Sequence, residues 1–132
     1  MKKFISLAAL TLLTNTVWGA AAPGPLFEGP LPPLGPNQEV VIQEITLAPG
    51  QVGSPHRHDA YVYVYVVEGA VDMQVDGGEV VRVATGEVFT ETPENVHTMS
   101  NNASKTEQAR FIAFLIKNAD APIVLPANSE SP

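Results

Sequence analysis

The chain contains no cysteine. Disulfide bonds and thiol chemistry are therefore excluded, and the hydrophobic core alone must hold the protein together. The 132 residues are enough for one domain with a modest core and too few for two.

Basic residues are scarce. Seven Lys and Arg residues stand against fourteen Asp and Glu residues, which gives a formal net charge of -7. No basic run occurs anywhere in the sequence. A surface this acidic argues against nucleic acid and against anionic membrane lipid as partners.

A hydrophobic run long enough to span a membrane is also missing. Lys2 and Lys3 precede an apolar run over residues 4–13, which is shorter than the ~20 residues that a bilayer of ~30 Å requires. The order of basic, apolar and then small residues predicts a signal peptide over residues 1–19, with a retained anchor as the alternative. We therefore expect a periplasmic or secreted protein that has no membrane partner after cleavage. Loss of the two lysines leaves five basic against fourteen acidic residues, a formal charge of -9.

Helix-forming patterns are absent from the rest of the chain. Residues 20–37 are rich in proline and glycine and predict an extended leader. Between residues 38 and 125, short β-branched or aromatic runs alternate with turn residues; these runs cover residues 39–48, 61–68, 70–75, 79–84, 87–92 and 109–117. Short strands at this spacing predict one all-β sandwich or barrel, followed by a polar tail over residues 126–132.

The run YVYVYVV is apolar on both faces of a strand. Tyr61, Tyr63 and Tyr65 share one face because side chains alternate along a strand, and valines occupy the other face. The valines are expected in the core. Three tyrosines on an open face would form a large apolar patch, so we expect a cover over them, either a second subunit in a homodimer or the leader.

The chain has only three histidines. His56 and His58 are two residues apart and point to the same face of a strand, so they present two imidazoles side by side. Such a pair suits a divalent transition metal, because each ring offers a neutral nitrogen lone pair. The alternative is a pair of partly exposed surface histidines.

The third histidine, His97, completes a pattern that resembles the two motifs of the cupin superfamily. The first motif comprises Gly50, His56, His58 and Gly69, and the second comprises Gly86, Pro93, His97 and Asn101. The resemblance implies a double-stranded β-helix (jelly-roll) cupin barrel. It also implies one divalent metal per chain, held by His56 and His58 from one strand and by His97 from a facing strand. Iron(II) is favoured on chemical grounds, with zinc, manganese, nickel or copper as alternatives.

The sequence departs from this family at one ligand position. Cupins commonly carry a glutamate as fourth ligand in the first motif, and that position is Val62 here. Glu91 is the candidate to fill the gap, as a fourth metal ligand or as a catalytic group beside the metal. Similar glutamates lie near the iron in cupins whose metal is held by three histidines, such as the dioxygenases that cleave β-diketones. The alternative is an ordinary carboxylate at the rim.

These residues predict the chemistry of the site. Three neutral imidazoles leave a divalent metal with its full charge, which favours a substrate that binds as an anion. Val62 makes the wall apolar. We therefore expect a small exported metal-binding cupin that acts as an Fe(II)-dependent dioxygenase on a small chelating substrate, either an enolised diketone or a phenol. The alternative is a non-catalytic module that binds a metal or a small molecule.

Overall fold

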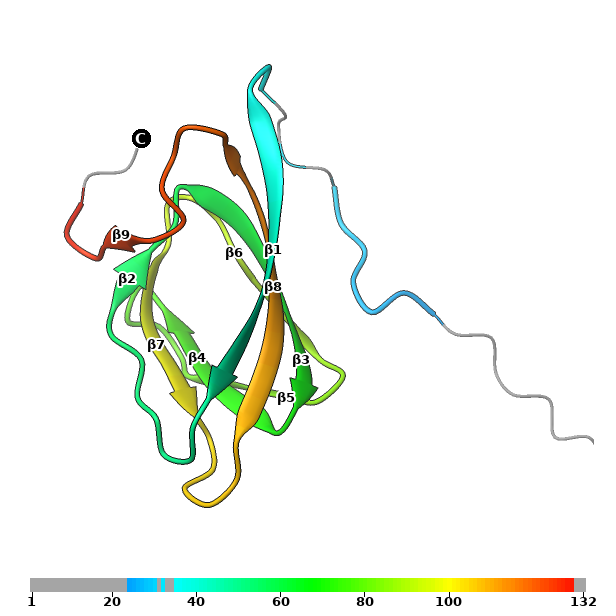
Figure 1. Ribbon diagram of the computed structural model, residues 1–132, viewed down its shortest axis with the longest axis vertical. Helices are drawn as coiled ribbons and strands as arrows, with labels where there is room; N and C mark the ends of the chain where they lie inside the picture. Colours follow the sequence, from blue (N-terminus) through cyan, green and yellow to red (C-terminus); the bar gives the residue numbers. More distant parts are fainter. Residues whose placement is uncertain (1–23, 31, 33–34, 130–132) are drawn as a thin grey trace, which may run out of the picture.

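The computed structural model describes residues 24–30, 32 and 35–129, and this part of the chain folds into strands joined by turns (Figure 1). The strands are β1 (Gln38–Leu47), β2 (His56–Arg57), β3 (Ala60–Glu68), β4 (Ala70–Val75), β5 (Val81–Ala84), β6 (Val88–Glu91), β7 (Val96–Asn102), β8 (Ala109–Asn118) and β9 (Leu125–Pro126). Within the described ranges there is no helix that could cross a membrane. The predicted signal peptide, residues 1–19, lies outside them.

The strands form two antiparallel sheets. One has the order β1-β8-β3-β6 and the other has the order β5-β4-β7-β2-β9. Partners such as β1 and β8, or β2 and β7, are far apart in the sequence and pair antiparallel (Figure 1). The predicted all-β jelly-roll fold is confirmed.

The core lies between the two sheets, and β3 shows how the sequence builds it. Val62, Val64 and Val66 are at most 2% exposed, whereas the tyrosines between them are half-buried on the outer face. The predicted division into an inner valine face and an outer tyrosine face is thus confirmed. Other strands contribute alternate residues to the same core, among them Leu47, Val71, Met73, Val83, Ala109, Phe111, Ala113 and Leu115.

The described part of the leader lies against the tyrosine face. The rings of Phe27 and Tyr63 are 5.2 Å apart between centroids, at an interplanar angle of 55°. Val40 and Ile42 on β1, which β8 separates from β3 in the same sheet, nevertheless remain 61% exposed. The leader therefore covers part of this face only, and the homodimer stays a prediction.

All six runs identified in the sequence overlap a strand, and the strands expected at His56 and at His97 are β2 and β7. The short β9 was not expected. β7 has the polar sequence VHTMSNN, which gives little strand signal by itself. It is fixed between β4 and β2 by pairing with both. β2 and β9 have two residues each, and β2 pairs with β7 on one side and with β9 on the other.

Candidate metal centre

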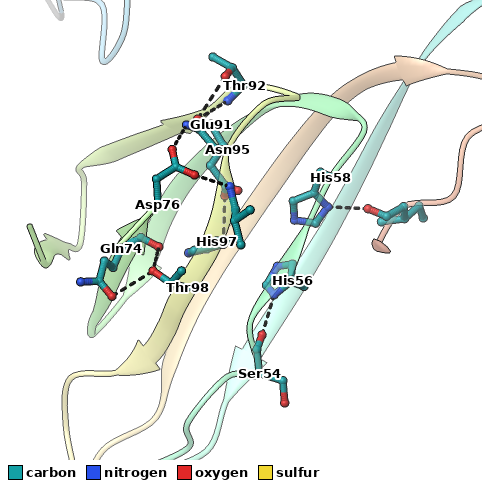
Figure 2. A network of polar contacts seen from close by, with 12 residues as sticks. Ser54, His56, His58, Gln74, Asp76, Glu91, Thr92, Asn95, His97 and Thr98 are labelled. Atoms are coloured by element: carbon teal, nitrogen blue, oxygen red, sulfur yellow. Dashed lines mark hydrogen bonds and ion pairs between the residues drawn. The ribbon is translucent and has the colours of Figure 1, made fainter. Parts of the chain in front are cut away.

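The fold brings all three histidines to one place. His56 in β2 pairs directly with His97 in β7, and His58 follows β2 by one residue (Figure 2). Ring centroids lie 4.9 Å apart for His56 and His58 and 5.0 Å apart for His56 and His97. One nitrogen from each ring can be chosen so that all three lie within 4.8 Å of one another. We call these residues the three-histidine centre.

Backbone carbonyls orient two of the imidazoles. The Nδ1 of His56 donates to the carbonyl of Ser54 at 2.8 Å, and the Nδ1 of His58 donates to the carbonyl of Ile123. A carbonyl can only accept a hydrogen bond, so the proton of each ring lies on Nδ1. Each Nε2 then keeps a lone pair for a metal, which is how metal-binding histidines are usually held.

The third imidazole lies beside the carboxyl group of Glu91. The Nδ1 of His97 lies 3.2 Å from Oε1 of Glu91, and both side chains are buried (Figure 2). Both ring nitrogens of His97 are buried, and neither has a hydrogen-bond partner in the described part of the chain. A buried nitrogen of this kind costs free energy unless a ligand uses its lone pair. The donor set therefore fits a metal ion.

Glu91 does not belong to the group of converging atoms. It ends β6, opposite Val62 of β3, and it is 4% exposed. The group of potential ligands contains the three histidines, and Glu91 contacts His97 from the Nδ1 side. This is the position of a residue that supports a ligand.

Burial governs the ionisation of the site. Desolvation, followed by the neighbouring His56 and His58, lowers the pKa of His97 to about 4. Desolvation also lowers the pKa of His58. It raises the pKa of Glu91 to about 7. His58 and His97 are consequently neutral at pH 7, as metal ligation requires.

A cavity of about 160 Å³ opens beside the three-histidine centre. Its lining residues are Gln43, Ile45, Leu47, His56, His58, Val62, Val64, Met73, His97, Ser100, Phe111, Ala113, Leu115 and Val124. Val62 was expected in this wall from the sequence, and it lines the cavity. Phe89 stacks on His97, with 6.1 Å between ring centroids.

The turn after β4 holds the start of β7, the strand that carries His97. Asp76 follows β4 in the left-handed region, at φ 54°. Its carboxylate accepts hydrogen bonds from the Nδ2 of Asn95 at 2.6 Å and from the backbone N–H of Val96 at 2.7 Å (Figure 2). These bonds anchor the start of β7 one residue before His97.

Sequence reasoning missed several residues of the site. Gln43 could have been found, because it lies on the inner side of β1 together with Ile45 and Leu47. Arg57, which is 3% exposed, was also missed. Ile123 and Val124 were missed because they come from a segment without any motif. Only the folding of the chain brings these last two residues to the histidines.

The fold and the three-histidine centre define a double-stranded β-helix protein with a candidate site for a divalent metal. A family model described as "Cupin domain" matches residues 43–115. The chain belongs to this cupin family. No curated protein matches the chain.

Solved structures share this fold. The polyketide cyclase RemF from Streptomyces resistomycificus is 24% identical, with a TM-score of 0.56 over 74% of this chain and 67% of that chain. An uncharacterized conserved protein with a double-stranded β-helix domain from Klebsiella pneumoniae subsp. pneumoniae MGH 78578 is 19% identical, with a TM-score of 0.56. The match covers 73% of this chain and 90% of that chain. A predicted oxalate decarboxylase from Thermotoga maritima is 20% identical, with a TM-score of 0.53. The match covers 58% of this chain and 65% of that chain. These likenesses concern the fold.

Proposed function

We propose that the protein is an exported, metal-dependent cupin enzyme, an Fe(II) dioxygenase that cleaves a small chelating substrate. The observation that carries this proposal is the convergence of three imidazoles at one wall of an apolar cavity. His56, His58 and His97 would hold the metal. Export rests on the basic, apolar and small residues at the start of the sequence.

The charge of the site favours an anionic substrate. The three-histidine centre is neutral in its ligating form, so a divalent metal would keep its charge of +2. Glu91 lies at the Nδ1 side of His97 and not among the converging atoms. An octahedral ion with three protein ligands leaves up to three positions for other ligands. Bound iron would supply dioxygen activation and Lewis acidity.

The cavity limits the size of the substrate. A cavity of about 150 Å³ in another protein accommodates benzene. The volume of about 160 Å³ here therefore suits one ring or a short chain. Val62, Val64 and Leu115 provide an apolar wall. An enolised β-diketone or a monocyclic phenol combines this size with a chelating or anionic oxygen.

The chain's own residues would orient the three imidazoles and keep water away from the substrate. Glu91 lies 3.2 Å from Nδ1 of His97, and the carbonyls of Ser54 and Ile123 accept hydrogen bonds from the other two rings. The apolar wall excludes water from the substrate. We assign Glu91 as a positioning residue that acts through His97.

One observation favours the alternative of a binding module. No carboxylate, lysine or arginine is among the described residues that line the cavity. A substrate bound there would find the imidazoles and the neutral side chains of Gln43 and Ser100 as its polar neighbours. A non-catalytic protein that binds a metal chelate needs no more than this.

Oxygen uptake separates the two functions. The protein would be loaded anaerobically with Fe(II) and mixed with acetylacetone or catechol in air-saturated buffer. We expect oxygen consumption in proportion to substrate loss, and none with Zn(II)-loaded protein. Binding of either probe without oxygen uptake would support the binding module. Failure of the wild-type protein to bind any divalent metal would overturn both the dioxygenase and the metal-binding module.

A further inference from the structure

The C-terminal segment after β8 returns to the three-histidine centre. We call residues 119–129 the C-terminal strap. Its β9 pairs antiparallel with β2, so that Pro126 lies opposite His56 and Leu125 lies opposite Arg57 (Figure 1). The chain then turns back, and both the backbone N–H and the hydroxyl of Ser129 donate to the carbonyl of Pro126.

The strap contributes directly to the metal centre. Its Ile123 carbonyl accepts the Nδ1 proton of His58 (Figure 2). The next residue, Val124, lines the cavity while remaining 54% exposed, which places it at the boundary between cavity and solvent. One short segment therefore both orients a ligand and forms part of the cavity wall.

A single buried side chain holds the end of this strap. Arg57 is 3% exposed and lies between the two histidines of the first motif. Its Nη1 donates to the carbonyl of Ser129 at 2.8 Å, and its Nη2 donates to the carbonyl of Pro93 at 2.7 Å. Pro93 belongs to the turn that leads into the strand of His97. The planar fork of one guanidinium thus ties the strap to the element that carries the third ligand.

We propose that Arg57 is a positioning residue for the metal centre and that strap docking and metal binding are coupled. This inference rests on the proposed function, because it requires a metal at the three-histidine centre. The docked strap keeps the proton of His58 on Nδ1 and its Nε2 lone pair directed at the metal. A metal bound to Nε2 in turn favours the docked strap, because coupling between two binding events is reciprocal. Loss of such support typically weakens metal affinity by about 10–100-fold.

The test compares wild-type protein with Arg57→Met, Arg57→Lys and the control Arg82→Met. Arg82 is an exposed arginine whose partner is Asp72, outside the centre. Zn(II) affinity would be measured by competition with a chromophoric chelator. Hydrogen exchange of the strap amides would be measured with and without Zn(II), and circular dichroism would establish that each variant is folded.

We expect Zn(II) to slow exchange in the wild-type strap about 10-fold or more. Arg57→Met should bind Zn(II) about 10–100-fold more weakly and lose most of this protection. Arg57→Lys should lie between them, because an ammonium is a point charge that cannot reproduce the fork. Arg82→Met should match wild type.

Different results would refute the coupling and the metal site. If the wild-type protein binds Zn(II) while strap exchange stays unchanged, the coupling is refuted and the metal site stands. Because this measurement uses the wild-type chain, it decides the coupling even if Arg57→Met does not fold, and Arg57→Lys then tests the role of Arg57. A wild-type protein that binds no Zn(II) would overturn the inference together with the proposed function.

Discussion

Glu91 and His97 face each other in the barrel interior, with Oε1 of the carboxylate 3.2 Å from Nδ1 of the imidazole. They come from different sheets, Glu91 from β6 and His97 from β7. A carboxylate in this position fixes the ring and increases the basicity of the opposite nitrogen. Glu91 can thus support the metal without contacting it.

Replacing Glu91 by glutamine should weaken metal affinity by about 10–100-fold while saturating metal still binds at one ion per chain. The amide oxygen can accept the Nδ1 proton, but it lacks the negative charge that raises the basicity of the ring. Affinity would be measured by chelator competition and stoichiometry by elemental analysis. Glu107→Gln is the matched control, because Glu107 is exposed. Unchanged affinity in both variants would show that Glu91 has no role in the centre.

Replacing His97 by alanine should abolish stoichiometric metal binding, because the chain has no fourth histidine that could replace the lost ligand. Zn(II) should raise the unfolding temperature of wild-type protein, since a ligand that binds the folded state stabilises it. The same addition should leave His97→Ala unchanged. One metal ion retained per chain in the variant, measured by elemental analysis, would contradict the three-histidine centre.

Restoring the family's usual glutamate at Val62 should change both charge and stability. Val62 lies opposite Glu91 in the β3–β6 pair, and both side chains are buried. Val62→Glu should destabilise the metal-free protein by about 2–3 kcal/mol, because a buried polar group lacks partners there. It should also lower the charge of the metal-loaded site by one and weaken anionic chelators. Val62→Gln is the control, with similar size and no charge. Equal affinity of all three proteins for acetylacetone would contradict the charge argument.

The stability of the protein should depend on Asp76 in a defined range of pH. Hydrogen bonds from Val96 and then from Asn95 hold the pKa of Asp76 below its usual value of 3.8. The ionised carboxylate therefore stabilises the fold above pH ~3.8, and this contribution disappears as the pH falls through the lower pKa of the folded state. Asp76→Asn should lower the free energy of unfolding at pH 7 by at most about 1 kcal/mol, because the group is exposed. Urea unfolding at pH 7 and pH 2.5 tests this. An equal difference at both pH values would exclude the carboxylate as its source.

The outer face of the β1-β8-β3-β6 sheet should carry the homodimer. Ile42 is 61% exposed there, beside the face that Phe27 covers in part. A charge at this position should dissociate a dimer, because charged groups are costly at the core of an interface. Ile42→Glu should give a monomer by light scattering with unchanged metal content, whereas Thr46→Glu, further along β1, serves as control. A wild-type monomer would leave the leader as the cover of the tyrosine face.

The sequence by itself determined the strands with strong alternation. In β3 the alternation of tyrosine and valine assigned the inner and outer faces, because one residue of shift would exchange them. The spacing of His56 and His58 indicated a pair of imidazoles, and the resemblance to the cupin motifs added His97 to the expected metal centre. Val62 indicated an apolar wall. The polar β7 and the short β2 and β9 lacked such a signal, since their pairing comes from distant parts of the chain.

The tertiary structure alone decided the surroundings of the histidines. Sequence spacing left Glu91 open as ligand, catalytic group or rim residue, and only the approach of β6 to β7 places it at the Nδ1 of His97. Ile123 and Ser129 carry no motif, yet hydrogen bonds from His58 and from the guanidinium of Arg57 join them to the centre. The physical reason is that hydrogen bonds act over about 3 Å in space, whereas these partners are separated by 65 and 72 residues of chain.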